Sequence, residues 1–518
     1  MKTLDYNAVT VACATIGVTV FLFVGNVFYN LFLHPLRKYP GPLLHRATRL
    51  GYVYNLMGGF LPRHVLAWHE KYGPVVRIAP DQLAFIDPEA WKDIYGHRTG
   101  SYIGTEEMAK SETFYVTPRI PLSIITEKRG NHAILRKKLS HGFSERAMRE
   151  QEPIIKSYVD LLIQRLYENC HLPESSTEYS DDAAAASEKT PKLQALDMTV
   201  WYNWTTFDII GDLAFGESFH CLKDVKYHPW VDAINKTILN NSVLIATKMM
   251  YLTFLIKVFF GFAAEGRKKS LEMSIIRVQK RKALGVERPD FLDGLIKPGK
   301  NEKQVLDIPH LASNASTLVL AGSETTATLL SGVTYLLLKN PKTLERLTAE
   351  VRSTFSSESE INFVSANGLS YMLACLNEAL RCYPPVPFGM PRIVPKGGAT
   401  IAGNFVSAGT SVACWQWAMN YSPVNWEDPN SFKPERFLEG SRNVNDNLDA
   451  MQPFSMGPRN CIGRNLAYTE MRLILARILY NFDIQLADPN LDWMEHQGSY
   501  ILWNKPQLNV YLKPVVRD

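Results

Sequence analysis

The sequence lacks the cysteine pattern of a disulfide-stapled or zinc-binding protein. Its 518 residues contain seven cysteines, none of them in a CxxC pair or a dense framework. An odd, scattered set is typical of a reducing compartment rather than of a secreted scaffold. The seven are Cys13, Cys170, Cys221, Cys375, Cys382, Cys414 and Cys461.

A large excess of one charge is also missing. The chain has 56 Lys and Arg against 51 Asp and Glu, a formal net charge of +5. Spread over this length, so small an excess argues against nucleic-acid binding, and we expect no nucleic-acid partner. The sequence has no GxGxxG motif, no complete P-loop and no internal repeat. We therefore expect no nucleotide-binding domain within the chain.

Long hydrophobic runs are few, and the one at the N-terminus is informative. Residues 6–33 include no charged side chain, and roughly 20 apolar residues suffice to cross a bilayer. A cleaved signal peptide has an apolar part of only about 7–15 residues. A buried core helix is seldom apolar on all its faces. The run therefore predicts a retained, single-pass transmembrane helix.

Basic residues are unevenly placed around this run. Lys2 precedes it, whereas Arg37, Lys38, Arg46 and Arg49 follow it closely. The positive-inside rule then predicts that the large C-terminal part faces the cytosol.

The remainder of the chain reads as one domain. Residues 39–42, with the sequence YPGP, predict a stiff elbow, because proline fixes its own φ and restrains the preceding residue. We expect an anchor and hinge at residues 1–38 and a catalytic domain at residues 39–518. Strand-like runs occur at 75–80 and 83–87, and the pattern is mainly helical after about residue 127.

Four further segments carry specific expectations. Residues 173–191 are polar and simple in composition, which predicts an exposed inserted loop. Residues 243–263 are apolar but contain two lysines, so they are expected either as a helix pair at the membrane surface or as a buried core helix. A long helix is expected from an N-cap at Asp307 to Lys339. A C-terminal β-hairpin is expected around residues 504–506.

The segment 454–463, FSMGPRNCIG, has the features that a thiolate ligand of haem iron requires. A lone cysteine is normally an inert buried thiol. Here the helix expected after Cys461 presents a positive dipole end that favours the thiolate. Gly457 and Gly463 permit a positive φ and a close approach of backbone to the ring. Arg459 is suited to bind a haem propionate as a charge-assisted donor.

Three other short motifs precede this segment. Glu378 and Arg381 share one face of a predicted helix, and Arg436 follows in the sequence PERF. In the sequence AGSETT, residues 321–326, an acid precedes a threonine. Gly322 inside a helix costs about 1 kcal/mol relative to alanine. It therefore either admits a close neighbour or opens the helix for function.

The segment 454–463 resembles the haem-binding signature FxxGxRxCxG of the cytochrome P450 superfamily. The matching residues are Phe454, Gly457, Arg459, Cys461 and Gly463. The other three motifs occur in the order of that family, and the resemblance spans nearly the whole chain after the anchor. It implies a mainly α fold with a small β region, preceded here by the N-terminal transmembrane helix, with haem b between the long helix and the Cys461 loop.

The resemblance also implies roles for individual residues. Cys461 would be the axial thiolate ligand, Glu324 a proton relay and Thr325 the hydrogen-bonding partner of dioxygen. A buried structural network supporting the loop is implied for Glu378, Arg381 and Arg436. Further contacts to the cofactor are implied for Ala321, Gly322, His132, Arg136 and Arg392.

For His132 and Arg136, a role other than contact with the cofactor is also open. His132 stands where the family often has tryptophan, and Arg136 with its neighbouring lysines equally suits a solvated basic face. The basic residues near this face suit docking of an acidic electron donor. The substrate pocket is expected to draw on residues 114–125, 319–321, 386–390 and 499–502, which are mostly apolar and suit a lipophilic substrate.

The implied function is insertion of one atom of dioxygen into a lipophilic small molecule. NADPH electrons would come from a separate NADPH–cytochrome P450 reductase, with the enzyme held by membrane lipid at the endoplasmic reticulum and facing the cytosol. The sequences FLHPLRKYPGP and HAILRKKLSHGFS resemble fungal microsomal members of secondary metabolism. Two alternatives remain open. One is isomerase, dehydratase or peroxide-dependent chemistry on the same haem, and the other is a non-catalytic haem-binding or sensor protein.

Overall fold

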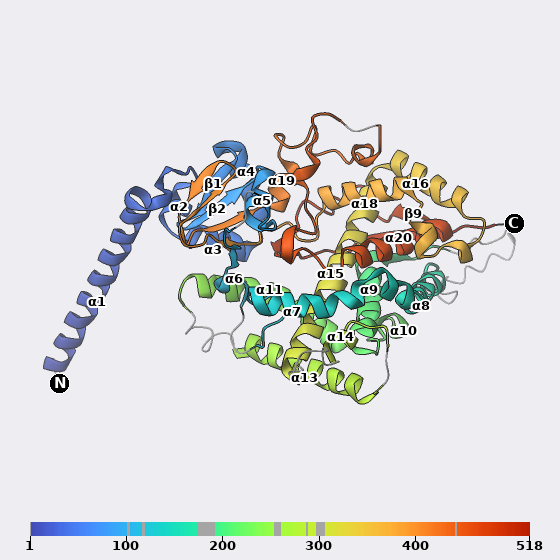
Figure 1. Ribbon diagram of the computed structural model, residues 1–518, viewed down its shortest axis with the longest axis horizontal. Coiled ribbons are helices and arrows are strands. Elements are labelled where there is room, and N and C mark those ends of the chain that lie inside the picture. The colour runs from blue at the N-terminus through green and yellow to red at the C-terminus, as the bar shows by residue number, and fades with distance from the viewer. Residues whose placement is uncertain are drawn as a thin grey trace, which may run out of the picture.

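The computed structural model describes residues 2–100, 104–116, 120–172, 192–252, 261–285, 288–296, 306–440 and 443–517. Within these ranges the fold is mainly helical with a small β region (Figure 1), which confirms the predicted fold class. The N- and C-termini lie at opposite ends of the molecule. The predicted polar loop at residues 173–191 lies outside the described residues.

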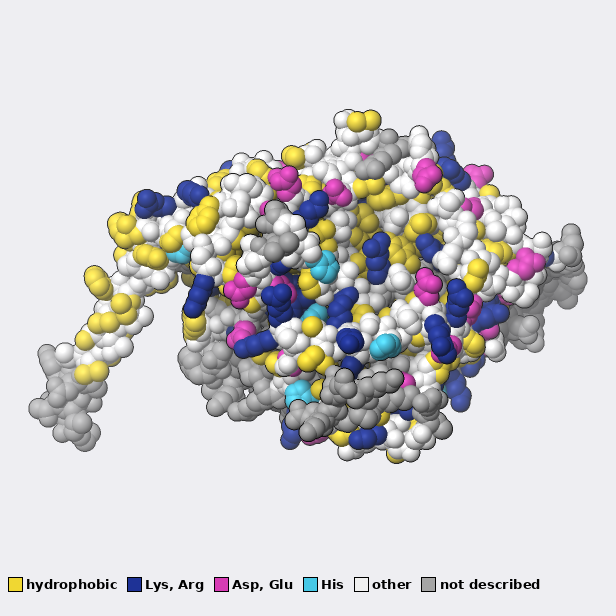
Figure 2. Space-filling model, in the orientation of Figure 1, with side chains coloured by type: hydrophobic (Ala, Val, Ile, Leu, Met, Phe, Trp, Pro, Cys, Tyr) yellow, Lys and Arg dark blue, Asp and Glu magenta, His cyan; other side chains and the backbone are white. Residues whose placement is uncertain are grey.

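The N-terminal helix projects away from the body of the protein (Figure 1). Helix α1 (Lys2–Phe28) continues directly into a π-helical turn, η1 (Tyr29–Leu33). Val9–Leu33 is long and apolar enough to cross a membrane, with a mean hydropathy of 2.1. Apolar side chains cover the described part of this helix (Figure 2). Among the described residues no other helix meets the same criteria of length and composition.

The base of this helix is fastened to the body. The Asn30 side chain donates to the Ala47 carbonyl at 2.9 Å. The fully buried Arg77 donates from Nη1 to the Asn30 carbonyl at 2.8 Å and from Nε to the Pro80 carbonyl at 2.9 Å. Leu36 is completely buried in the apolar core around the sheet. The chain between anchor and body is therefore packed rather than loosely tethered.

The largest sheet lies near this base, with the strand order β1-β2-β8-β5-β3 (Figure 1). Its first two strands pair antiparallel and coincide with the two predicted strand-like runs. The five strands are β1 (Val75–Ala79), β2 (Gln82–Phe85), β8 (Ser411–Cys414), β5 (Arg392–Ile393) and β3 (Ala109–Lys110). A small hairpin joins β6 (Ala399–Ile401) and β7 (Asn404–Val406). Short helices cover this end: α2 (Leu43–Ala47), α3 (Leu50–Gly58), α4 (Leu61–Tyr72), α5 (Glu89–Tyr95), α6 (Glu112–Tyr115) and α19 (Gln416–Tyr421).

The long helices form the rest of the body. They are α7 (Arg129–Ser140), α8 (Glu145–Asn169), α9 (Met198–Phe215), α11 (Pro229–Met249), α13 (Gly261–Ala283), α15 (Ile308–Lys339), α16 (Pro341–Thr354), α18 (Ser370–Cys382) and α20 (Arg464–Asn481). Shorter helices α10 (Cys221–Asp224), α14 (Asp293–Ile296) and α17 (Phe363–Ala366) lie between them. Helix α15 runs through the middle and contacts α9, α13, α16, α18 and α20.

The bounds predicted for the long helix are confirmed. The Asp307 side chain accepts a hydrogen bond from the backbone N–H of His310, as an N-cap should, and proline occupies the first turn. The helix ends at Lys339, directly before Asn340. Both ends of the helix therefore follow from residues that the sequence shows directly, the N-cap Asp307 and the C-terminal Asn340.

The predicted C-terminal hairpin around residues 504–506 is wrong. A tight hairpin does occur, but it turns at Ile501, between β10 (Ser499–Tyr500) and β11 (Leu502–Trp503). The last strand, β12 (Asn509–Pro514), instead pairs with β4 (Ala195–Asp197) and β9 (Phe482–Leu486). In the segment 504–506, Lys505 instead contacts Glu324 on α15, and the Pro506 carbonyl accepts a hydrogen bond from Trp493.

The apolar segment 243–263 is partly described. Ile245, Ala246 and Met249 on α11 are buried in the core beside the sheet, which favours the core-helix alternative for this half. Tyr251 is 85% exposed. Residues 253–260 lie outside the described residues, so contact of this segment with a membrane remains untested.

Candidate active site

The Cys461 loop is held in shape by its own backbone. A short 3₁₀ turn, Gly457–Arg459, leads into it, and α20 begins three residues after Cys461. The backbone N–H of Cys461 donates to the Phe454 carbonyl at 2.8 Å. The Phe454 ring lies 5.3 Å from the Tyr468 ring on α20. The loop is thus closed at its base and fixed to the helix that follows.

The Cys461 thiol is accessible at one side and enclosed by protein on the others. This burial raises the pKa of the Cys461 thiol, against the opposing effects of the Gly463 backbone N–H and of Arg136 and Arg464. The Gly463 N–H at the start of α20 lowers the thiol pKa as expected, but burial raises it by more, so the protonated thiol is favoured. A bound metal ion deprotonates a coordinating thiol outright.

The two glycines of the loop differ. Gly457 has a φ of +72°, and a Cβ built on it would lie 1.9 Å from the Tyr95 carbonyl oxygen of α5. Gly463 has a φ of −88° and serves as the N-cap of α20, so it does not use the positive φ that glycine permits. The nearest atom to a Cβ at Gly463 is Cε1 of Phe143, at 3.7 Å.

Basic side chains converge on one carboxylate beside this loop. Arg459 Nε donates to Glu107 Oε1 at 2.7 Å, and Arg392 Nη1 lies 4.0 Å from the same oxygen. Burial, reinforced by Arg392 and Arg459, lowers the pKa of Lys110 well below its ordinary value. Among the described groups, Arg392 Nε is buried without a hydrogen-bond partner. The cluster therefore carries more buried positive charge than Glu107 balances.

This excess fits the cofactor that the sequence resemblance implies. A haem presents two propionate carboxylates, and arginine is the preferred partner of carboxylates. Arg392 and Arg459 would bind these propionates, and the added negative charge would relieve the repulsion around Lys110. The structure thus brings Arg459 and Arg392, which lie far apart in sequence, to one place.

His132 and Arg136 both lie on α7 near this cluster. Burial, followed by the charges of Arg459, Lys110 and Arg136, lowers the pKa of His132 to about 4, so its ring is neutral at pH 7. Arg136 Nη1 donates to the Asn460 carbonyl at 2.7 Å. Arg136 thus contacts the residue preceding Cys461 directly and is not a purely solvated basic residue. Direct contacts of either residue with haem stay predictions.

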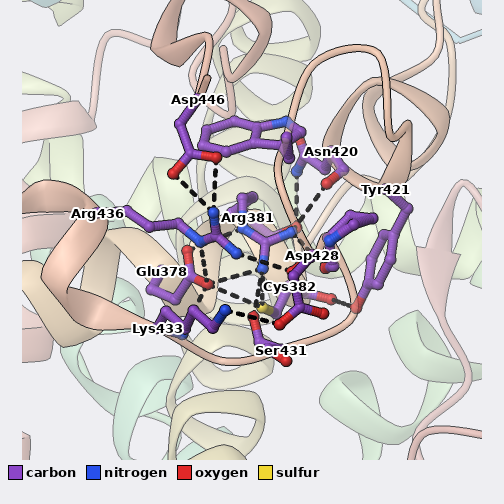
Figure 3. Close-up of polar contacts among 12 residues, drawn as sticks. Glu378, Arg381, Cys382, Asn420, Tyr421, Asp428, Ser431, Lys433, Arg436 and Asp446 are labelled. Carbon is purple, nitrogen blue, oxygen red and sulfur yellow. Dashed lines mark hydrogen bonds and ion pairs between the residues drawn. The ribbon is translucent and has the colours of Figure 1, made fainter. Parts of the chain in front are cut away.

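The Glu378, Arg381 and Arg436 side chains meet in a buried network (Figure 3). Arg381 contacts Glu378 through two hydrogen bonds of 2.7 and 2.8 Å, and Arg436 Nε lies 3.3 Å from Glu378 Oε1. Asp446, absent from the sequence prediction, pairs with Arg436 at 2.6 Å. Two arginines therefore share two carboxylates, so the buried charges balance.

The network is joined to the segment before the Cys461 loop rather than to the loop itself. Arg381 donates to the carbonyls of Asn420, Pro429 and Ser431. Arg436 donates to the carbonyls of Glu427 and Asp428. These bonds tie α18 to residues 420–446 (Figure 3). The network would therefore support the haem loop indirectly, through residues 420–446.

The AGSETT segment lies on α15, which stays α-helical through Gly322. A Cβ at Gly322 would lie 2.9 Å from Ile210 Cδ1 of α9, which favours the reading that Gly322 admits a close neighbour. The Thr325 hydroxyl donates to the Ala321 carbonyl at 2.6 Å. Ala321 and Thr325 are accessible to solvent although Val319 and Ser323 are buried. One face of the central helix is thus open at Ala321 and Thr325.

Glu324 lies elsewhere on the helix. Its carboxylate is 2.8 Å from Lys505 Nζ, and the side chains are 4% and 6% exposed, respectively. The structure therefore places the predicted proton relay in a buried ion pair rather than beside the Thr325 hydroxyl.

The segments expected to line the substrate pocket are partly brought together. The rings of Phe114 and Phe388 lie 6.0 Å apart, and Ile501 packs against the same apolar cluster. Ile501 has a φ of +84°, a conformation that a β-branched residue rarely adopts. Residues 117–119 lie outside the described residues.

Sequence reasoning missed four residues of the site, one of which is Asp446 in the buried network. Glu107 and Lys110 belong to the cationic cluster, and Lys505 pairs with Glu324. No local pattern marks Glu107 or Lys505, because their partners Arg459 and Glu324 are distant in sequence. One general rule could have indicated Glu107: buried arginines need a carboxylate to balance their charge.

Comparison with known proteins agrees with this geometry. The profile of the family described as Cytochrome P450 matches residues 40–512. Cytochrome P450 monooxygenase tpeC of Talaromyces stipitatus is 46% identical over 97% of this chain and 95% of its own length. The trichothecene C-15 hydroxylase of Fusarium sporotrichioides is 43% identical, over 94% of this chain and 95% of its own length. The averantin hydroxylase of Dothistroma septosporum is 42% identical, over 97% of this chain and 91% of its own length.

The family match covers the body of the chain, and the similarity to the relatives is nearly full-length. Membership of this family implies a haem-thiolate enzyme, and the mainly helical fold agrees with it. The chain therefore belongs to the cytochrome P450 family and is a monooxygenase of the fungal secondary-metabolism group.

Proposed function

We propose that this enzyme inserts one oxygen atom into a lipophilic secondary metabolite, using haem b bound through the Cys461 thiolate. The observation that carries the proposal is the closed Cys461 loop beside a buried cluster of arginines that lacks enough carboxylate. Bound haem supplies the redox chemistry that activates dioxygen.

The side chains of this enzyme would bind the haem and supply the hydroxyl and proton donor that the reaction needs. Cys461 would supply the thiolate that holds the iron. Arg459 and Arg392 would hold the propionates, and Thr325 would offer a hydroxyl on the accessible side of α15. Glu324 would pass protons toward that face as a general acid.

NADPH–cytochrome P450 reductase is the proposed electron donor. A cavity of about 620 Å³ lies beside α20, and its lining includes Arg149, Arg464 and Arg472. Lys and Arg side chains are prominent across the middle of the face seen in Figure 2, over α7, α8 and α20. Such a surface suits an acidic electron donor.

The membrane setting supports the same partner. The N-terminal helix is suited to a single span, and the basic residues that follow it favour a cytosolic catalytic body. We place the enzyme at the endoplasmic reticulum membrane, where the reductase would share the same lipid surface.

The substrate is proposed to be a polycyclic or terpenoid lipophile. Two relatives are named as hydroxylases of a trichothecene and of averantin. The apolar residues around Phe114 and Phe388 suit a lipophile of this kind. A panel of sesquiterpenoids and anthraquinones, screened for spectral shifts, is the appropriate starting set.

Turnover under isotope-labelled dioxygen tests the proposal. The purified enzyme, with reductase and NADPH, should incorporate one labelled oxygen atom into at least one panel compound. A rearranged or dehydrated product without label would establish isomerase-type chemistry instead. Stable haem with no NADPH-dependent turnover of any panel compound would favour a sensor.

A second test addresses the ligand itself. Cys461→Ala should abolish the carbon-monoxide absorption band of reduced thiolate-bound haem, because no sulfur remains to bind the iron. Replacement of the buried Cys414 by alanine is the matched control and should keep the band. A band that persists in Cys461→Ala would refute the assignment.

A further inference from the structure

Basic side chains gather where the N-terminal helix joins the body. Arg37 and Lys38 are exposed on a 3₁₀ turn, η2 (Pro35–Lys38), and Arg46 is half-buried on α2. Figure 2 shows basic side chains beside apolar ones at this joint. We call Arg37, Lys38 and Arg46 the anchor-base patch.

Within the described chain, no carboxylate pairs with the anchor-base patch. Arg37 and Arg46 each donate to a backbone carbonyl, at 3.2 Å in both cases. Neither these two side chains nor Lys38 forms an ion pair among the described residues, and Asp81 is already paired with Arg49. An anion from outside the protein can therefore bind the patch without displacing an acidic side chain.

A buried positive charge lies behind the patch. Arg77 is fully buried, and its hydrogen-bond partners in the described chain are the backbone carbonyls of Asn30 and Pro80. Burial, followed by the charge of Arg46, lowers the pKa of Arg77 to about 10, against the opposing charge of Asp81. The two guanidinium groups therefore repel each other, and an anion beside Arg46 would offset that repulsion.

The surroundings of the patch suit a lipid surface. The apolar run Val9–Leu33 ends shortly before Arg37. Helix α2 contacts α1 and η1, and its Leu43 and Leu44 side chains are 68% and 56% exposed. The headgroup layer adds about 5–8 Å to each side of the hydrocarbon core of a bilayer. Residues just beyond the span therefore lie at the level of the lipid phosphates.

We propose that the anchor-base patch binds the phosphate of an anionic lipid headgroup, with Arg37 and Arg46 as its direct contacts. This inference rests on the proposed membrane setting of the N-terminal helix. Guanidinium groups match the geometry of a phosphate. The exposed residues after the span would alone satisfy the positive-inside rule. The fold adds Arg46 and the buried Arg77, which makes the patch a site rather than a diffuse charge.

The test measures binding of fluorescently labelled dioctanoyl phosphatidylserine to the full-length holoenzyme in neutral detergent, by fluorescence anisotropy. Each basic residue at such a surface contributes about fivefold in affinity, so Arg37→Gln/Arg46→Gln should weaken binding about 30-fold. Lys71→Gln/Lys92→Gln is the matched control, because it removes two exposed lysines of α4 and α5 at the same end of the body. The control should keep the wild-type affinity. Equal losses in both variants would show attraction by net charge alone and overturn the proposal.

Unlabelled competitors identify the ligand. Dioctanoyl phosphatidylserine and dioctanoyl phosphatidic acid should displace the probe, whereas dioctanoyl phosphatidylcholine, whose headgroup is neutral overall, should not. Displacement by inorganic phosphate at the same concentration would show a site for free anions and overturn the assignment to lipid. If Arg37→Gln/Arg46→Gln loses its haem spectrum, Arg37→Gln/Lys38→Gln takes its place, because it changes only exposed side chains. An unchanged affinity in that variant would also overturn the proposal.

Stability gives a second readout. A ligand that binds only the folded state stabilises it. Saturating dioctanoyl phosphatidylserine should therefore raise the denaturation midpoint of the wild type and of Lys71→Gln/Lys92→Gln equally, and should leave that of Arg37→Gln/Arg46→Gln almost unchanged. A midpoint that rises equally in all three proteins would contradict the site.

Retention in vesicles of phosphatidylcholine alone, during alkaline extraction, tests the membrane setting separately. The wild type and both double variants should remain in these vesicles, because the N-terminal helix is unchanged. Loss of the wild type would refute the membrane span, whereas selective binding of the anionic probe in detergent would still establish the patch.

Discussion

At the scale of single residues, the site depends on buried charges that balance one another. Glu378 is completely buried and serves both Arg381 and Arg436. Asp446 supplies the second negative charge. Among the described residues, the hydrogen bonds of the network join α18 to the segment from Asn420 to Asp446, so we expect its contribution to be to stability.

Glu378→Gln should lower the free energy of unfolding by about 3–5 kcal/mol, because it leaves a buried arginine without its carboxylate. Denaturant unfolding of the holoenzyme measures the loss. Glu112→Gln is the matched control, since Glu112 pairs with Lys128 at the surface with exposures of 72% and 81%. That change should cost only about 0–1 kcal/mol. Equal losses in both variants would contradict the view that the buried network matters.

The loop glycines offer a second comparison. Gly457→Ala forces a Cβ against the Tyr95 carbonyl at a positive φ, and should cost about 1–3 kcal/mol from overlap alone. The carbon-monoxide band and the denaturation midpoint should both fall. Gly463→Ala meets only Phe143 at 3.7 Å and should keep normal stability. A Gly463→Ala variant that is the less stable of the two would show that steric room at Gly457 is not the decisive feature.

At the scale of elements, local chemistry was predictable and distant pairing was not. The ends of α15 follow from Asp307 and Asn340, which the sequence displays directly. The partners of β12 lie far away in the chain, at β4 and β9, so no nearby pattern selects them. The same holds for Lys505, whose partner Glu324 is 181 residues away. The partner of a buried charged residue can therefore be identified only when the fold is known.

Helix α20 carries a buried acid outside the proposed chemistry. Glu470 is 1% exposed, and its Oε1 has no hydrogen-bond partner within the described chain. Burial raises the pKa of Glu470 to about 8, compared with about 4.3 in an unfolded chain. Between these values the folded state holds a proton that the unfolded state has lost. Stability is therefore full at low pH and declines as pH rises toward 8, by about 1.4 kcal/mol per pH unit.

Glu470→Gln should remove this pH dependence, because glutamine does not titrate. Chemical denaturation at several pH values between 5 and 8 should show a flatter profile for the variant than for the wild type. Glu439→Gln, at an exposed position, should keep the wild-type slope. Parallel profiles for Glu470→Gln and the wild type would mean that Glu470 is ionised in the folded protein.

At the scale of the whole molecule, the anchor and the body are one structure. The sequence predicts a boundary at residues 38 and 39, yet Asn30 and Leu36 already pack against the body. The apolar run alone identifies the helix, but the bond from Arg77 to Asn30 spans 47 residues and has no sequence signature.

Two truncations test this attachment. Removal of residues 2–28 should leave the free energy of unfolding nearly unchanged, because the hydrogen bonds from Asn30 to Ala47 and from Arg77 to Asn30 remain. Removal of residues 2–34 takes away the Asn30 carbonyl, one of the two carbonyls that accept hydrogen bonds from the buried Arg77, and should cost about 1–3 kcal/mol. Denaturant titration of both proteins in detergent measures the difference. Identical stabilities would show that the base of the anchor is a free hinge.

The clamp between Arg77 and Asn30 has a mechanical consequence. A helix embedded in lipid has a preferred tilt, and a stiff joint passes that tilt to everything attached to it. The angle and height at which the basic surface over α7, α8 and α20 (Figure 2) meets a partner would then be set within the chain itself. A partner anchored in the same bilayer would then meet the basic surface at a fixed height above the lipid. Only lateral diffusion and rotation about the membrane normal would be needed to bring the two proteins together.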